Sequence, residues 1–153
     1  MRKPYMRIVA LALLLCLFPT LSGCGGGIVE TYLTVKKLIG IWQLYQLFND
    51  GQPSVIQFAS ALLKLGKTFD FSLEHINDQG VTVESETGTW DVENGVLVLN
   101  VQTSTIDPTA VGTTLRLPGQ FTDGSANTVS ITRPVTQGQV SVSQEQVYQR
   151  VPN

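Results

Sequence analysis

One stretch of strict alternation decides the fold: residues 68–75 read TFDFSLEH. Apolar, aromatic or imidazole side chains occupy every second position, and polar side chains stand between them. Because successive side chains of a β-strand point to opposite faces, this pattern predicts a strand with one buried face. The side chains expected on that face are Phe69, Phe71, Leu73 and His75.

The chain that follows this strand is predicted to be almost entirely β. Asn94-Gly95 supplies the two positive φ angles of a type I′ hairpin turn, and Gly88 marks a bend. The expected strands are residues 81–86 with a continuation over 88–92 after the bend, then 96–102, 113–117, 128–133, 139–143 and 146–151. About eight short strands in all, mostly linked by hairpins, predict an antiparallel up-and-down barrel or a sandwich.

Two further elements are expected before the alternating stretch. Residues 40–48, GIWQLYQLF, are rich in aromatic and β-branched residues and run into Asn49-Asp50-Gly51, which predicts a strand and a tight turn. Apolar residues within 28–38 have the spacing of a short helix. This part of the chain therefore predicts a short N-terminal helix that leads into the first strand.

Residues 54–65 interrupt the β pattern. Ser54 and Gln57 have the spacing of a helical capping box, and Gly66 suits the position just after a helix. The segment predicts a mostly apolar helix after the first strand. Such a helix would cover the core or an opening into it, or offer a docking surface.

The segment Leu38–Trp42 carries a family resemblance: a short helical entry followed by Gly-x-Trp at the start of the first strand resembles the lipocalin signature. Residues 69–71 (FDF), 88–92 (GTWDV) and 97–99 (LVL) are similar to bacterial lipocalin-like domains. The resemblance covers residues 38–151 and implies a lipocalin-like barrel. It also implies that Arg150 packs across Trp42 in a cation–π contact.

The first 23 residues have the form of a secretory signal. Three basic residues precede an apolar run over residues 8–18, which is too short to span a bilayer as a helix of about 20 residues. Leu21-Ser22-Gly23-Cys24 resembles the lipobox of bacterial lipoproteins. That resemblance implies a diacylglycerol thioether on Cys24, cleavage before it, and in many cases a third acyl chain such as palmitate. Gly25, where an Asp would favour the inner membrane, favours the outer membrane with the domain facing the periplasm.

Removal of this signal would leave 130 of the 153 residues, enough for one domain with a core. The expected organisation is a signal peptide over 1–23, a lipidated tether and short helix over 24–37, and a barrel domain over 38–153. Seven basic and twelve acidic residues would remain, a net charge of −5, which makes nucleic acid or an anionic lipid surface a poor partner. With Cys16 in the signal and Cys24 lipidated, no cysteine remains for catalysis, a disulfide or a zinc site.

The titratable residues point to no catalytic or metal centre. His75 is the single histidine of the sequence, and at the end of a strand it is expected to be a hydrogen-bonded structural residue. Seven of the twelve acidic residues lie within 70–93, where Asp70, Glu74, Glu84 and Glu86 are expected on solvated strand faces and not in a calcium loop. The sequence therefore predicts no enzyme, metal or cofactor.

Five residues are candidates for the barrel interior. They either line a pocket for a small molecule or fill the interior with side chains. These residues are Trp42, Phe69, Phe71, Leu73 and Trp90. Two functions follow: a membrane-anchored envelope lipoprotein that binds a small hydrophobic or amphipathic ligand, or a structural module that meets another envelope protein without a ligand.

Overall fold

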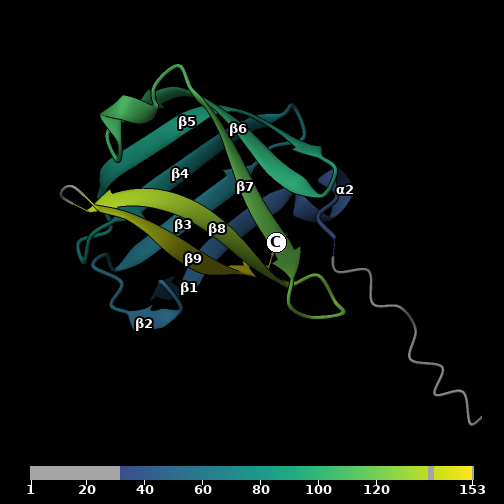
Figure 1. Cartoon of the computed structure of the whole chain (residues 1–153), viewed down its shortest axis with the longest axis horizontal. Helices are drawn as coiled ribbons and strands as arrows, with labels where there is room; N and C mark the ends of the chain where they lie inside the picture. Colours follow the sequence, from purple (N-terminus) through teal and green to yellow (C-terminus); the bar gives the residue numbers. More distant parts are fainter. Residues whose placement is uncertain (1–31, 138–139, 153) are drawn as a thin grey trace, which may run out of the picture.

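Eight antiparallel strands close into an up-and-down β-barrel in the computed structural model, which describes residues 32–137 and 140–152 (Figure 1). The eight strands follow one another around the barrel in chain order. They are β1 (Gly40–Asn49), β3 (Ser60–Leu65), β4 (Asp70–Ile76), β5 (Thr82–Glu93), β6 (Val96–Ser104), β7 (Thr114–Phe121), β8 (Thr128–Gln137) and β9 (Val140–Arg150). The predicted fold class is confirmed.

Three short elements complete the described chain. Strand β2 (Gln52–Ser54) forms a hairpin with the end of β1, outside the closed ring. The helix α2 (Val35–Leu38) precedes β1, and the 3-10 helix η2 (Pro108–Ala110) joins β6 to β7. Of the N-terminal helix predicted within residues 28–38, the structure shows this last turn, and residues 28–31 lie outside the described part.

The first and last strands close the barrel. Strand β1 pairs with β9 from Trp42 opposite Arg150 to Asn49 opposite Gln144. A register shift between Leu44 and Gln46 makes a bulge, which bends the strand. The closure joins segments about a hundred residues apart in the chain, so the barrel depends on non-local pairing.

The glycine turns act as the sequence predicted. Asn94 and Gly95 have φ angles of 53° and 78°, as a type I′ turn between β5 and β6 requires. At Gly88 a Cβ atom would lie 2.0 Å from the carbonyl oxygen of Asn100, so a side chain cannot be accommodated there. Strand β5 passes through this point without interruption, as predicted, whereas β9 unites the two strands predicted over 139–143 and 146–151.

The predicted helix over residues 54–65 is wrong. Residues 60–65 form β3, with Ala61, Leu63 and Leu65 buried and the residues between them partly exposed. The capping-box pattern is a local signal worth about 1 kcal/mol, whereas β3 gains a complete ladder with β4 and pairs with the start of β1. The strand pairing outweighs the local signal, and residues 55–59 form a connection with no regular structure.

Phe69 departs from the predicted alternation. Its φ angle is 63°, the strand begins one residue later, and its side chain is 45% exposed beside Trp90. Phe71 and Leu73 are buried as expected. The positive φ turns the chain before β4, so Phe69 does not share the face of the other two.

Candidate functional site

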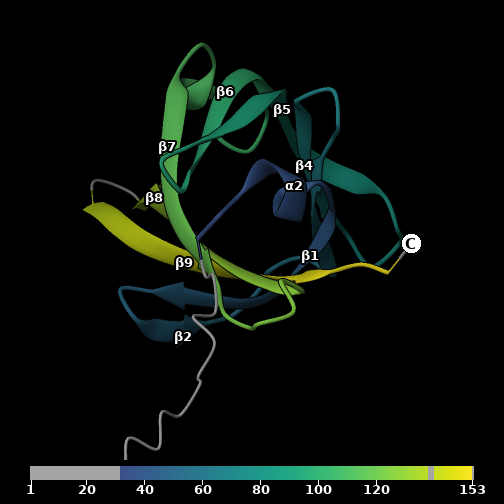
Figure 2. The same cartoon turned by 90° about the vertical axis from the view of Figure 1, so that its right-hand side faces the viewer.

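The two ends of the barrel interior differ. At one end, large buried side chains pack together in the interior. The helix α2 lies across the opening at this end (Figure 2). We call this the closed end. Its fully buried side chains include Trp42, Trp90, Phe121, Leu38 and Leu97.

The opposite end, here called the open end, contains a cavity of about 530 Å³. This volume lies within the usual range for small-molecule sites. Its apolar lining consists of Leu44, Leu47, Val55, Ile56, Phe58, Leu73, Ile106 and Val135. Its polar lining consists of Asn49, Ser54, Gln57, His75, Glu84, Arg133, Gln144 and Gln146.

The cavity arises where two neighbouring strands separate. Strand β1 pairs with β3 only over Gly40–Gln43, and beyond its bulge it pairs with β9 and β2. The segment 55–59 occupies the space between β1 and the start of β3, and Ile56, Gln57 and Phe58 from this segment face the cavity. The segment that the sequence predicted to be a helix therefore forms part of the cavity wall.

A buried ion pair borders the cavity. The Arg133 guanidinium donates two hydrogen bonds to the Glu86 carboxylate, each 2.9 Å long, and Ser104 donates a third at 3.0 Å. Arg133 is 6% exposed and Glu86 is fully buried. Such bidentate geometry, with further hydrogen bonds, is what allows a buried pair to offset its desolvation cost. The positive charge of Arg133 is thus compensated inside the barrel.

A chain of side-chain hydrogen bonds runs along β9 and crosses to β1. The Tyr148 hydroxyl donates to Gln146 Oε1 (2.8 Å), Gln146 Nε2 to Gln144 Oε1 (2.6 Å), and Gln144 Nε2 to Asn49 Oδ1 (3.2 Å). Asn49 Nδ2 then donates to Ser54 Oγ (3.1 Å). We call Gln146, Gln144 and Asn49 the amide chain. Burial raises the pKa of Tyr148 above its ordinary value, so its phenol is held as a neutral donor at the base of this chain.

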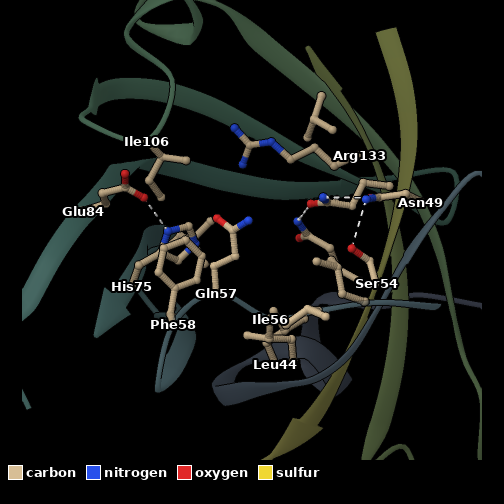
Figure 3. A pocket seen from close by; sticks show the side chains of 16 residues that line it. Leu44, Asn49, Ser54, Ile56, Gln57, Phe58, His75, Glu84, Ile106 and Arg133 are labelled. Carbon is tan, nitrogen blue, oxygen red and sulfur yellow. Dashed lines mark hydrogen bonds and ion pairs between the residues drawn. The ribbon is translucent and has the colours of Figure 1, made fainter. Parts of the chain in front are cut away.

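His75 stands on the opposite wall. Its Nδ1 lies 2.8 Å from Glu84 Oε2, and the ring of Phe58 stacks on the imidazole with centroids 3.8 Å apart. Figure 3 shows this group on one side of the cavity, Asn49 and Ser54 on the other, and Arg133 between them. Within the described part of the chain, no hydroxyl is hydrogen-bonded to His75, so the arrangement shows no activated nucleophile.

The structure separates the five predicted interior residues. Trp42, Phe71 and Trp90 belong to the packed core, and the lining of the cavity includes Leu73 but none of the other four. Phe69 is half-exposed. The cavity therefore lies farther along the barrel than the aromatic residues suggested, because the large rings fill the closed end.

Arg150 lies where the lipocalin resemblance implied. Its guanidinium carbon is 4.1 Å from the centre of a Trp42 ring, and it donates to the carbonyl oxygens of Ile39 and Lys37. Burial lowers the pKa of Arg150 from its ordinary value. Trp42 Nε1 donates to the carbonyl oxygen of Leu38 at 2.8 Å. These contacts attach the segment before β1 to the closed end.

The expected position of Glu86 on a solvated face is wrong. Glu86 faces the interior together with Gly88 and Trp90, at every second position of β5. The alternation from Trp90 back to Glu86 was readable in the sequence, but a carboxylate inside a barrel needs a partner that the sequence does not reveal. That partner, Arg133, lies 47 residues away.

Cys24 and the rest of the predicted signal lie outside the described residues. Over the described part of the chain, no group of three or more histidine, cysteine or acidic side chains could hold a metal ion. Among the same residues, no helix is long and apolar enough to cross a membrane.

Comparison with known proteins adds no assignment. No protein-family model matches this chain, and no curated protein is significantly similar to it in sequence. Any function must therefore be argued from the cavity and from the residues around it.

Proposed function

We propose that this chain is a membrane-anchored lipoprotein of the bacterial envelope whose lipocalin-like barrel binds a small amphipathic molecule. The observation that carries the proposal is the cavity of about 530 Å³ at the open end. A barrel of eight strands is just wide enough to be filled by side chains or to hold one small ligand. In this barrel, side chains fill the closed end, and the open end has room for one small ligand.

The lining supports an amphipathic ligand. Leu44 and Ile56 lie together on one side of the cavity, whereas Arg133 and the amide chain present hydrogen-bonding atoms (Figure 3). Sites for small molecules combine an apolar lining with a few placed polar groups that fix orientation. A ligand with an apolar body and a polar head would match both surfaces.

The anchor belongs to the same proposal and rests on the lipobox resemblance at Cys24. Residues 32–38 lead into the closed end, where Tyr32 bridges to Gln120 of β7. A lipid on Cys24 would be joined to the closed end through residues 25–31. Incorporation of radioactive palmitate into the wild type, and its loss in Cys24→Ser, tests the anchor.

The alternative of a docking module without a ligand called for either the barrel surface or an apolar helix over residues 54–65 as the docking face. The helix is not formed, since residues 60–65 are β3 and residues 55–58 line the cavity, and the barrel surface is the face left for that alternative. Ligand binding is therefore the function that the geometry supports best.

Native mass spectrometry of the full chain carrying Cys24→Ser, purified without detergent, tests the binding. We expect a small molecule to stay bound, because a ligand that covers the apolar lining of the cavity stabilises the folded protein. Leu47→Trp, which fills the cavity, should lose the added mass. Tyr45→Trp, on the same strand and 58% exposed, should keep it. A bare protein mass in all three proteins would contradict the proposal.

A further inference from the structure

Among the residues that the structure describes, the cavity lining holds no uncompensated positive charge. Arg133 is the sole Lys or Arg in this described lining, and both of its bonded nitrogens are directed to Glu86, 2.9 Å away. The pair is neutral as a unit. An anionic head group placed beside Arg133 would also meet the field of the Glu86 carboxylate, so the pair offers hydrogen bonds to a ligand but little net attraction for a negative charge.

The second charged group of the cavity is neutral or negative. Glu84 and His75 form a contact of 2.8 Å, and over residues 32–137 and 140–152 no other ionisable side chain besides Arg133 lines the cavity. If His75 is protonated the pair is neutral, and if it is not the pair carries a charge of −1. In both states the charge of the cavity lining together with Glu86 is zero or −1, which disfavours an anion.

The amide chain offers both donors and acceptors. A carboxamide has two N–H donors and two lone pairs on its oxygen. Within the described part of the chain, each of Gln146, Gln144 and Asn49 uses one donor and one acceptor in the chain of hydrogen bonds. Each side chain keeps one donor and one acceptor for a ligand. A hydroxyl or amide group can pair with both, whereas a carboxylate accepts only.

We propose that the ligand carries an uncharged hydroxyl- or amide-bearing head group on an apolar body, and that the cavity rejects carboxylates and phosphates of the same size. The inference rests on the proposed function, since it assigns a ligand class to the same cavity. The Arg133–Glu86 pair sets this selectivity, because the Glu86 carboxylate offsets the positive charge of Arg133 that would otherwise attract an anion. The amide chain supplies the matching donors and acceptors.

Decanamide and decanoate form a matched pair of probes, because they share a chain and differ in the charge of a planar head group. Isothermal titration calorimetry of the full chain with Cys24→Ser, at pH 8 and below the micelle concentrations, should show decanamide binding about tenfold more tightly than decanoate. Leu47→Trp should abolish both. Glu86→Gln, which leaves Arg133 uncompensated, should reverse the preference.

A second variant keeps the test independent of the buried pair. Glu84→Gln removes one negative charge at the rim, where the Glu84 side chain is 41% exposed, and should strengthen decanoate binding about threefold relative to decanamide binding. Glu93→Gln is the matched control, since Glu93 pairs with Arg116 at the end of β5 far from the cavity. It should change neither affinity.

The outcomes separate the ligand class from the proposed function. Decanoate binding as tight as or tighter than decanamide, with both lost in Leu47→Trp, would overturn the ligand class and leave cavity binding intact. Decanamide binding that survives Leu47→Trp would place the probe outside the cavity and overturn the inference. If neither decanamide nor decanoate bound, the inference and the proposed function would both be overturned.

Discussion

The closed and open ends of this barrel are made by the same strands but by different interior side chains. At the closed end the inward positions carry large rings and leucines, as at Trp42 and Trp90. Farther along the same strands they carry Asn49 and Glu84, and on β9 they carry Gln144. The difference teaches that one alternating pattern builds both a core and a cavity. The side chains at the inward positions decide which is formed.

Truncation of a large apolar side chain at each end should give the largest contrast. Trp42→Ala deletes a fully buried side chain among packed neighbours and should cost about 4 kcal/mol of unfolding free energy. Leu47 borders the cavity, so its side chain already lacks packing neighbours on one side. Leu47→Ala should therefore cost about 1 kcal/mol of unfolding free energy. Urea denaturation followed by circular dichroism measures both. Equal costs would show that the open end is packed like the closed end.

Breaking the buried ion pair should have the next largest effect. Glu86→Gln leaves the Arg133 charge buried without its counter-charge and should cost about 3 kcal/mol. Replacing both residues, with Glu86→Leu and Arg133→Met, should recover most of that loss because no charge remains buried. The same urea titration applies. If the double variant were as unstable as the single one, the charge would not be the cause.

The third effect is confined to alkaline pH and concerns Tyr148. Burial raises its pKa in the folded state above the unfolded value of about 10. Its contribution to stability is therefore complete below about pH 10 and is lost as the pH rises above that value, by up to about 1.4 kcal/mol per pH unit. Tyr148→Phe should flatten this alkaline decline in thermal unfolding. Tyr45→Phe, exposed on β1, should leave it unchanged, and an unchanged slope in Tyr148→Phe would contradict the assignment.

Much of the fold could be predicted from the sequence because its signals are local. The alternation over residues 68–75 and the Asn94-Gly95 turn specify strands and a hairpin without reference to distant residues. The segment 54–65 could not be assigned in this way. Its capping-box residues favour a helix locally, and only pairing with β1 and β4 makes residues 60–65 a strand.

The site was less accessible from the sequence than the fold. The cavity depends on the separation of β1 and β3 and on the bulge after Leu44, and both are set by register between distant strands. Glu86 shares its inward face with Trp90, so its direction was readable, but its pairing with Arg133 was not. The predicted interior residues were mainly aromatic, and aromatic side chains are large and fill the core at the closed end. The polar residues that mark the cavity resemble surface residues in composition.

The central claim is that the open end encloses a ligand. A crystal structure of the Cys24→Ser protein, purified without detergent, tests this most directly. The account predicts continuous non-protein density between Arg133 and Ile56, with a polar end at the amide chain. Inward collapse of residues 55–59 that fills the cavity with their own side chains would contradict it.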